Sequence, residues 1–260
     1  MTQPSLSIII IAANEASNIV SCINSAHFAD EVLVVDSGSI DNTVELAIAT
    51  GAIVLQTNWL GYGPQQNRGL DTSTGNWIFS LDADERITPE LANDILSAIR
   101  DAKFNVYDVP RSSLYVSRFM KYSGWTPDRT RRLCKRGTAR FTEHEIHANL
   151  NTTHLVGHLN HPIIHYSYHD FHSVVEKMNR YSSGGARDMY AAGKSGSLSK
   201  AITHGLWAFL RTYFLRLGFL DGREGFMLAI SNAEVTYYRY IKLYYLGLEA
   251  AGKNIPKKHP

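Results

Sequence analysis

The first hundred residues alternate short apolar runs with segments whose apolar residues recur every three or four positions. Runs rich in Ile, Val or Leu are typical of buried strands, and the longer spacing is typical of one face of a helix. The pattern predicts strands at 6–13, 32–35, 52–56 and 77–81. It predicts helices at 15–29, from about 41 to 50, inside 61–75 and from 88 onward. Strands that alternate with helices predict a largely parallel sheet in a layered α/β domain.

The alternation breaks down from about residue 104. Shorter strands are predicted at 106–110, 132–135 and 139–141, and the stretch 165–169 reads as extended. After Asp170 the spacing becomes helical over 174–192, 198–217 and 225–246, with glycine clusters between these segments. We therefore predict an α/β domain over residues 1–165 and a C-terminal helical region over residues 166–260.

Two aspartates, Asp82 and Asp84, directly follow the apolar run at 77–81. In an extended chain residues i and i+2 point to the same side, so both carboxylates are predicted to point at one spot beyond the strand. Ligands of open α/β sheets bind at that end. Paired oxygen donors suit Mg²⁺ or Mn²⁺, which in turn binds a diphosphate. Because Asp-x-Asp is common by chance, its position after a strand carries this prediction.

Polar residues also follow the first two predicted strands. Asn14 and Glu15 follow the first, and Asp36 follows the second. Taken singly, Asn14 is equally well explained as a helix cap and Asp36 as a turn residue. Together with the two later aspartates they predict a ligand site on one edge of the sheet. Neither GxGxxG after the first strand nor GxxxxGK[ST] occurs, which weighs against dinucleotide and P-loop sites.

Composition narrows the setting of this site. The 260 residues are 44% hydrophobic, enough for one large domain or one domain with an appendage. The net charge of +2 weighs against nucleic acid as the main partner. Two isolated cysteines, Cys22 and Cys134, suggest a reducing compartment. The first four residues carry no positively charged side chain, so no signal peptide is indicated, and no apolar run is long enough to span a bilayer. We expect a cytoplasmic protein.

The polar clusters resemble the motifs of family 2 glycosyltransferases of the GT-A fold, on Asn14-Glu15, the segment 34–43 and the segment 81–85. Three further motifs resemble bacterial lipopolysaccharide-core glycosyltransferases: Trp59-x-Gly61-x-Gly63-x-Gln65, Ser123-Gly124-Trp125-x-Pro127-Asp128-Arg129 and Gly218-Phe219-Leu220-Asp221-Gly222. These enzymes are commonly β-glucosyltransferases acting on the inner-core heptose. The similarity covers about residues 6 to 246. It implies a metal-dependent, inverting transfer of a hexose, with UDP-glucose as the expected donor, to a lipid-linked saccharide such as the lipopolysaccharide inner core.

The resemblance also implies roles for individual residues. Asp36 would lie near the nucleoside base, Asp82 would meet the ribose or the metal, and Asp84 would bind the metal that bridges the diphosphate. The implied donor-binding residues are Ala13, Asn14, Glu15, Asp36, Gln66, Asn67, Asp82, Ala83 and Asp84. The implied cofactor is Mg²⁺ or Mn²⁺, which neutralises charge on the departing nucleoside diphosphate.

An inverting transfer also needs a carboxylate that takes the proton from the acceptor hydroxyl. In the resembled family a His-Glu pair follows the Pro-Asp-Arg motif. Here His147 matches, but Ala148 stands at the Glu position. Glu143 and Glu145 are the alternative sources of the carboxylate, with Asp128 a third, and either glutamate could instead be a solvated loop residue. The departure at Ala148 leaves open a non-catalytic membrane adaptor that keeps only nucleotide-sugar binding.

Two compositional features remain. Eight histidines lie between residues 144 and 172 but match no standard zinc spacing, although His165 could contact the diphosphate or the metal. The helical region mixes aromatic residues such as Trp207 and Tyr213 with basic residues such as Arg211 and Arg239. That mixture suits an anionic membrane surface, while the same aromatics could simply form a core. We predict peripheral binding to the inner face of the bacterial inner membrane. A metal-dependent phosphatase or nucleotidyltransferase using Asp82 and Asp84 is a third possibility, which ranks low because a phosphatase's aspartates are expected after the first strand and here they follow the fourth.

Overall fold

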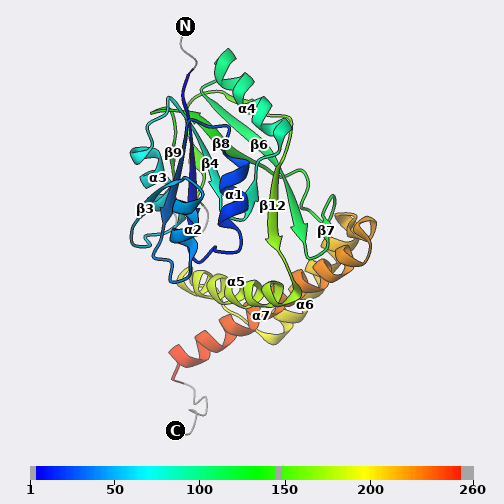
Figure 1. Cartoon of the computed structure of the whole chain (residues 1–260). Coiled ribbons are helices and arrows are strands. Elements are labelled where there is room, and N and C mark those ends of the chain that lie inside the picture. The colour runs from blue at the N-terminus through cyan, green and yellow to red at the C-terminus, as the bar shows by residue number, and fades with distance from the viewer. Residues whose placement is uncertain (1–3, 144–147, 253–260) are drawn as a thin grey trace. The chain divides into compact units, whose positions relative to one another are not determined.

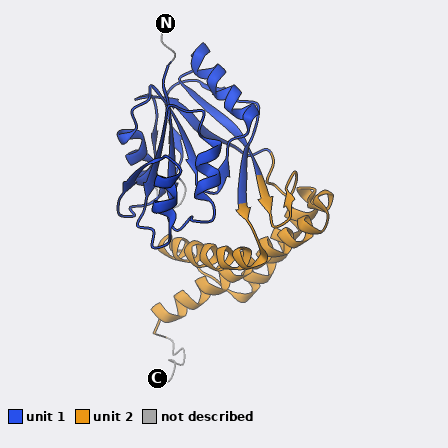
Figure 2. Cartoon of the chain, viewed as in Figure 1, with its two compact units in different colours: residues 1–112, 127–166 blue, residues 113–126, 167–260 orange. Residues whose placement is uncertain are grey.

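The computed structural model describes residues 4–143 and 148–252 (Figure 1). The chain divides into two compact units (Figure 2). The first unit comprises Met1–Ser112 and Pro127–Tyr166, and the second comprises Ser113–Thr126 and Ser167–Pro260. The boundary expected between residues 165 and 166 falls one residue from that at Tyr166, whereas the segment 113–126 lies in the second unit.

Four parallel strands form the half of the sheet that the first hundred residues build. They are β1 (Leu6–Ala12), β2 (Glu31–Asp36), β3 (Ile53–Gln56) and β4 (Trp77–Asp82), in the order β3-β2-β1-β4. Every residue of β1 is buried, as expected for a strand of a parallel sheet that is covered on both faces. All four strands begin and end within two residues of the predicted positions, which confirms the parallel α/β prediction for this part of the chain.

Four helices flank these strands: α1 (Ile19–Ser25), α2 (Thr43–Ala49), α3 (Tyr62–Thr72) and α4 (Pro89–Asp101) (Figure 1). Alternate residues of β1 enter two different cores. Ile8 and Ile10 pack in a core that includes apolar residues of α1 and α4. Ile9 and Ile11 pack in a second core with Leu70 of α3. The helices therefore cover both faces of the sheet, and its strand ends are left free at the edges.

From residue 85 onward the strands pair mostly antiparallel. They are β5 (Glu85–Arg86), β6 (Val106–Tyr115), β7 (Arg118–Phe119), β8 (Arg129–Lys135), β9 (Arg140–Phe141), β10 (Leu150–Asn151), β11 (Val156–His158) and β12 (Ile163–Tyr168). The ladders β4–β8, β6–β8, β6–β7, β5–β12 and β9–β10 are antiparallel, and β6–β11 is parallel. Among the described residues no helix lies between α4 and residue 171, so these strands have no helical crossovers to return them in parallel.

The second unit is mainly helical. It contains α5 (Phe171–Ala191), α6 (Leu198–Leu210), a π-helical turn η1 (Arg211–Leu215), a 3₁₀ turn η2 (Gly218–Asp221) and α7 (Gly222–Ala250). The side chain of Asp170 caps α5 and that of Ser197 caps α6, each accepting a backbone N–H of the first turn. This confirms the prediction of a helical region after Asp170. Within the described residues no helix combines the length and the apolar character needed to cross a bilayer.

Candidate active site

The carboxyl ends of β1, β2 and β4 lie side by side. Asp36, the last residue of β2, stands opposite Ala12 of β1, and Asp82, the last residue of β4, stands opposite Ile11. Because neighbouring strands are about 4.8 Å apart, the two aspartate backbones lie roughly 10 Å apart, with the end of β1 between them. The polar residues that follow three strands in the sequence thus share one edge of the sheet, hereafter the active edge.

The chain turns immediately after Asp82. Ala83 and Asp84 form a turn, and the following β5 pairs with β12. Asp82 and Asp84 are therefore not held by one extended strand, and the i, i+2 argument made from the sequence does not describe them. The turn instead brings Asp84 to β12, where its Oδ2 lies 3.3 Å from Nε2 of His165. The backbone N–H of Tyr166 donates to the carbonyl of Asp84 at 2.9 Å and fixes the turn.

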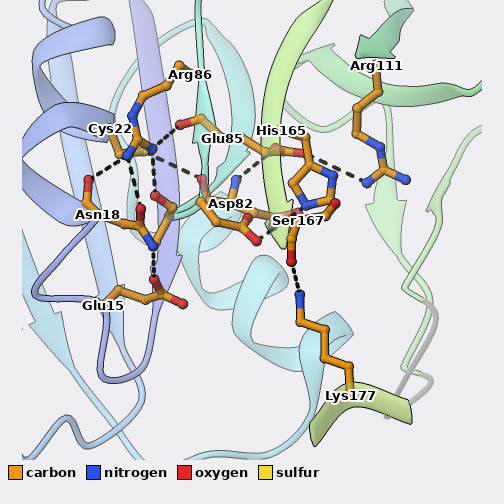
Figure 3. Close-up of polar contacts among 12 residues, drawn as sticks. Glu15, Asn18, Cys22, Asp82, Glu85, Arg86, Arg111, His165, Ser167 and Lys177 are labelled. Carbon is orange, nitrogen blue, oxygen red and sulfur yellow. Dashed lines mark hydrogen bonds and ion pairs between the residues drawn. The ribbon is translucent and has the colours of Figure 1, made fainter. Parts of the chain in front are cut away.

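Asp82 is held by a buried ion cluster (Figure 3). Arg132 of β8 is only 6% exposed, and its Nη2 donates to Asp82 Oδ2 at 2.6 Å and to Glu85 Oε1 at 2.9 Å. Glu85 is fully buried and accepts the backbone N–H of Asp82 through Oε2 at 3.0 Å. Arg111 extends the cluster, with Nη1 3.7 Å from Glu85 Oε1 and Nη2 2.7 Å from Asp128 Oδ2.

The environment moves the pKa values of the two carboxyls in opposite directions. Burial alone would raise the pKa of Asp82, but the Arg132 guanidinium outweighs it and holds that pKa below its usual range. Burial raises the pKa of Glu85 above its ordinary value, and Arg132 opposes this only in part. Sequence reasoning missed Arg132. The one signal it offered was an arginine next to the apolar pair Leu133-Cys134 in a predicted strand.

Asp84 and His165 form the part of the active edge that best fits a divalent cation. Their side chains are 24% and 15% exposed, and they present a carboxylate oxygen and an imidazole nitrogen 3.3 Å apart. The oxygens of Asp82 already accept from Arg132 and from Nε2 of Gln66 at 3.3 Å. In the described residues no group of three or more His, Cys, Asp or Glu side chains could hold a metal ion. Phosphate oxygens and water would have to supply the remaining ligands of a cation bound by these two residues.

Two loops are tied together at the other end of the active edge. Asn14, with φ of 56°, takes the left-handed conformation that asparagine tolerates. Its backbone N–H donates to Ser39 Oγ at 2.8 Å, and its Oδ1 accepts from the N–H of Ile40 at 2.9 Å. The N–H of Glu15 donates to Thr43 Oγ1 at 2.8 Å. The turn after β1 is thus clamped to the loop after β2, and it leaves Ala13 and Asn14 exposed.

Asp36 shapes the loop after β2. It is 2% exposed, and its Oδ2 accepts the backbone N–H groups of Gly38 at 3.0 Å and Ser39 at 3.1 Å. The hydroxyl of Ser39 donates to Oδ1 at 2.5 Å. The two interpretations of Asp36, as a turn residue and as a residue of a ligand site, are therefore compatible. It folds the turn, and it lies at the edge of the sheet where a nucleoside is expected.

The three amide residues of α3 have different partners. Gln66 accepts from the hydroxyl of Ser80 at 2.5 Å and donates to Asp82, so it supports the active edge directly. Gln65 donates to Ser37 Oγ at 2.6 Å. Asn67 is 4% exposed and bonds to both the N–H and the carbonyl of Phe141, at 2.9 and 3.0 Å. These contacts make Asn67 a support for the segment at 141 rather than an available donor-binding group.

The glycine motif before α3 has a steric explanation. A Cβ on Gly63 would lie 1.8 Å from the carbonyl oxygen of Thr142, and Gly61 has φ of 107°, a conformation that other residues rarely adopt. The start of α3 therefore packs directly on the backbone of the segment at 141–143. This contact joins the motif to the part of the chain in which the general base is sought.

The candidates for the general base are only partly described. Glu145 and His147 lie outside the described residues. Glu143 is exposed, and Ala148, at the position of the family's Glu, is half-buried. Asp128 is ion-paired with Arg111 at 2.7 Å, so it would have to leave that partner to accept a proton. The structure therefore leaves Glu143, Glu145 and Asp128 as alternatives.

Comparisons with known proteins identify relatives of this chain. Residues 7–156 match the model of the family described as glycosyl transferase family 2. An uncharacterised glycosyltransferase of Rickettsia prowazekii is 31% identical over 94% of this chain and 88% of the relative. The lipopolysaccharide core biosynthesis glycosyltransferase LpsC of Rhizobium meliloti is 28% identical over 92% of each chain.

Solved structures give a weaker likeness. The glucosyl-3-phosphoglycerate synthase of Mycobacterium tuberculosis, in complex with Mn²⁺, UDP and glucosyl-3-phosphoglycerate, has a TM-score of 0.37 and 26% identity. The match covers 43% of this chain and 44% of that one. A likeness of that extent supports no conclusion about this chain.

Proposed function

Because the chain belongs to glycosyltransferase family 2, we propose that it transfers a hexose from a nucleoside diphosphate sugar to a lipid-linked saccharide, with inversion at the anomeric carbon. UDP-glucose is the expected donor, and the lipopolysaccharide inner core is the expected acceptor class. The α/β sheet flanked by helices and followed by a helical region is the GT-A architecture that this membership implies. The observation that carries the proposal is the pairing of Asp84 with His165 on the sheet edge that also bears Asp36. The likeness to LpsC supports the acceptor class.

The residues of the active edge divide the work of the transfer. Asp84 and His165 would hold Mg²⁺ or Mn²⁺, which supplies positive charge to the departing diphosphate. Arg132 and Gln66 fix the Asp82 carboxylate, so that it can accept a ribose hydroxyl at a set position. The exposed turn at Ala13 and Asn14 would border the nucleoside. One of Glu143, Glu145 or Asp128 would take the proton from the acceptor hydroxyl as its oxygen attacks the anomeric carbon.

We also propose that the protein works at a membrane surface, on the inner face of the bacterial inner membrane. A lipid-linked acceptor lies at such a surface, and the second unit combines exposed aromatic side chains with exposed arginines. Trp207 is 53% exposed and Phe214 is 52% exposed, and Arg211 and Arg216 are exposed beside them in the sequence.

A donor-binding experiment tests the proposal. Thermal unfolding is followed with UDP-, GDP- and ADP-sugars, each with and without Mn²⁺, and UDP release is then measured with and without core acceptor. We expect stabilisation by one nucleotide class that needs the cation, and UDP release that increases with acceptor. Stabilisation by no nucleotide sugar, or a metal-dependent shift that survives Asp84→Ala, would refute the assignment of the site.

A second candidate function rests on Ala148. A protein that keeps the donor site but lacks the base would be a nucleotide-sugar-binding membrane adaptor. It would show the same thermal stabilisation by donor and cation, yet no UDP release under any condition. UDP release that rises in Ala148→Glu, with donor binding unchanged, would indicate that the family's carboxylate position is functional in this chain.

A further inference from the structure

Helix α6 is packed in the reverse of the usual pattern for a helix in water. Its buried residues are small, namely Ala201, Gly205 and Ala208. Its large apolar residues face outward, with Leu198 56% exposed, Ile202 54%, Leu206 58%, Trp207 53% and Leu210 37%. Leu198, Ile202, Leu206 and Leu210 follow one another at intervals of four, so they form a single stripe. A surface helix of a globular protein normally turns such a stripe toward the core.

The small residues of α6 allow close packing on α7. A Cβ on Gly205 would lie 3.3 Å from the carbonyl oxygen of Ala233 and 3.4 Å from Cβ of Tyr237. Helix pairs in lipid pack in this way, with small residues between the backbones and large apolar residues outside. No described helix spans a bilayer, so the resemblance concerns packing at an interface and not a transmembrane segment.

The exposed apolar side chains continue from α6 into α7. Aromatic rings connect α6 to α7, with 5.8 Å between the ring centroids of Phe209 and Phe226. The ring centroid of Tyr213 in η1 lies 5.5 Å from that of Phe226 and 6.3 Å from that of Phe219 in η2. We call the following set the apolar surface: Leu198, Ile202, Leu206, Trp207, Leu210, Phe214, Leu215, Leu217, Phe219, Leu220, Phe226 and Ile230. Each is at least 37% exposed, and Leu215 reaches 65%. Contiguous apolar surface of this kind marks a binding face.

The charges along this surface are mostly positive, and the exposed acid Glu234 lies one helical turn beyond Ile230. Between residues 198 and 230 the exposed charged residues are Lys200, Arg211, Arg216 and Arg223. The two acids in that range, Asp221 and Glu224, have side chains only 0% and 8% exposed. The partner of this surface is therefore expected to be apolar and anionic together.

Both acids are withdrawn from the surface by hydrogen bonds. Asp221 accepts the backbone N–H groups of Lys121 and Tyr122 and the hydroxyl of Ser123, each at 3.0 Å. Glu224 accepts from Ser117 Oγ at 2.9 Å and is also ion-paired with Nε of the exposed Arg223 at 2.8 Å. The Ser-Gly-Trp and Gly-Phe-Leu-Asp-Gly motifs, which the sequence singled out, thus lie against each other in the second unit.

These motifs also need their glycines. A Cβ on Gly225 would lie 1.9 Å from the carbonyl oxygen of Gly218, and a Cβ on Gly124 would lie 2.4 Å from the guanidinium of Arg216. Leu217, with φ of 55°, turns the chain between η1 and η2. The hydrogen bonds and close packing between the two motifs hold Leu217, Phe219 and Leu220 in an exposed turn that continues the apolar surface.

We propose that the apolar surface binds an anionic phospholipid bilayer. Its apolar side chains enter the boundary between headgroups and acyl chains, and its four cationic side chains contact lipid phosphates. The inference rests on the proposed function, in which the acceptor is lipid-linked, and it names the surface and the lipid class. A second copy of the chain fits this surface less well, because a two-fold contact would bring the same four cations together.

Vesicle co-sedimentation tests the assignment on the full chain, using phosphatidylcholine vesicles with and without phosphatidylglycerol. Two variants alter the surface: Phe219→Ser with Leu220→Ser, and Arg216→Glu with Arg223→Glu. Two matched controls alter exposed residues of the first unit: Ile48→Ser with Ile53→Ser, and Arg100→Glu with Lys103→Glu. We expect the wild type and both controls to bind the anionic vesicles in a salt-sensitive way. Each surface variant should bind these vesicles with an affinity at least roughly tenfold lower.

Three readouts keep the outcomes distinct. Circular dichroism and the thermal midpoint establish that each variant is folded. Donor-induced thermal stabilisation, which should be unchanged in the surface variants, reports the active edge separately. If nucleotide sugars do not stabilise the wild type although it binds the anionic vesicles, the proposed function is wrong and this inference still holds. Vesicle binding equal in wild type and surface variants would overturn the inference, as would a dimer at micromolar concentration that only the surface variants lose.

Discussion

Arg132 gives the most direct test of how the active edge is built. Its guanidinium contacts the Asp82 carboxylate at 2.6 Å and the Glu85 carboxylate at 2.9 Å, and Glu85 is fully buried. Arg132→Met keeps most of the volume and removes the charge, so that among the described residues Glu85 keeps Arg111, at 3.7 Å, as its ion-pair partner. Removing one partner of a buried ion pair costs about 3–5 kcal/mol in free energy of unfolding. We expect a loss of that size at pH 8.

The size of the loss should depend on pH, with a sign that follows from Glu85. Burial already raises the pKa of this carboxyl, and removal of Arg132 raises it further. A carboxyl whose pKa is raised in the folded state destabilises the fold increasingly as the pH rises from its unfolded pKa to its folded pKa, and the penalty disappears once the carboxyl is protonated in both states. The difference between wild type and Arg132→Met should therefore shrink as the pH falls from 8 toward about 4.3, the ordinary pKa of a glutamate.

Urea unfolding of both proteins at several pH values measures this difference, and Arg140→Met is the matched control. Arg140 pairs with Asp71 at 2.8 Å, a distance similar to that of Arg132, but both side chains are 59% exposed. Exposed pairs contribute about 0–1 kcal/mol, so the control should lose little. Equal losses in the two variants, or a loss in Arg132→Met that does not change with pH, would show that the buried cluster is not what holds this edge.

Three further predictions address other parts of the first unit. Asp94 accepts the backbone N–H groups of Asn160 and His161 at 2.8 and 2.9 Å; burial would raise its pKa, but these bonds outweigh it and lower that pKa. Asp94→Ala should therefore lower the free energy of unfolding by about 1.5–3 kcal/mol at pH 7. Urea titrations should show this difference shrinking as the pH falls below about 3.9, the ordinary pKa of an aspartate, because a carboxyl with a lowered folded pKa loses its stabilising effect as it becomes protonated. Asp84→Ala should abolish the Mn²⁺-dependent thermal stabilisation by UDP and His165→Ala should weaken it, whereas a metal effect retained in both would exclude the pair as ligands. Gly63→Ala should lower the thermal midpoint sharply, since its Cβ would lie 1.8 Å from the Thr142 carbonyl oxygen, whereas Gly184→Ala, in the middle of α5 with nothing within 4 Å, should be neutral or stabilising.

The parallel half of the sheet could be predicted, because its strands are defined by the local pattern of apolar residues. The runs at 6–13 and 77–81 are apolar except for Ser7 and Ser80 because their strands are covered on both faces, and that property is visible in the sequence. The convergence of Asp36 and Asp82 also followed, since parallel strands end at the same edge. Their shared edge depends only on strand direction, which the alternation with helices determines.

Contacts between residues distant in the chain could not be predicted in this way. Arg132 lies 50 residues from Asp82 and 47 from Glu85, and its strand, Arg129–Lys135, is rich in positive charge. The apolar pair Leu133-Cys134 beside Arg132 is the one local signal, and it does not by itself separate the buried Arg132 from the exposed Arg129 and Lys135. The turn at 83–84 was missed for a similar reason, because it forms when β5 pairs with β12, about eighty residues further on.

The helical region shows a third limit. Spacing predicted the helices after Asp170 but left open whether their aromatic residues were core or membrane-facing. Both uses have the same period of 3.6, so the period cannot separate them. The difference lies in which residues face the neighbouring helix, and α6 turns Ala201, Gly205 and Ala208 inward. The available signal was the recurrence of small residues at intervals of three and four, which is a weaker pattern than that of the large apolar residues on the same helix.

If the proposed donor binds at the active edge, the charges there give a reason for a cation to bind with it. Near the turn at 83–84, the carboxylates of Asp82, Glu85 and Asp128 pair with the guanidinium groups of Arg111 and Arg132, whereas Arg86 donates to the backbone carbonyls of Ala83 and Glu85. Arg132 contacts Asp82 and Glu85, and Arg111 contacts Asp128 and lies 3.7 Å from Glu85, while the Asp84 carboxylate lies 3.3 Å from His165. A diphosphate brought to Asp84 would meet a carboxylate of the same sign, which in a poorly hydrated site costs more than it would in water. A divalent cation between them removes that repulsion. The buried cluster thus leaves Asp84 as the carboxylate that is open to a cation, and that is why a change at Arg132 should alter stability while a change at Asp84 should alter binding.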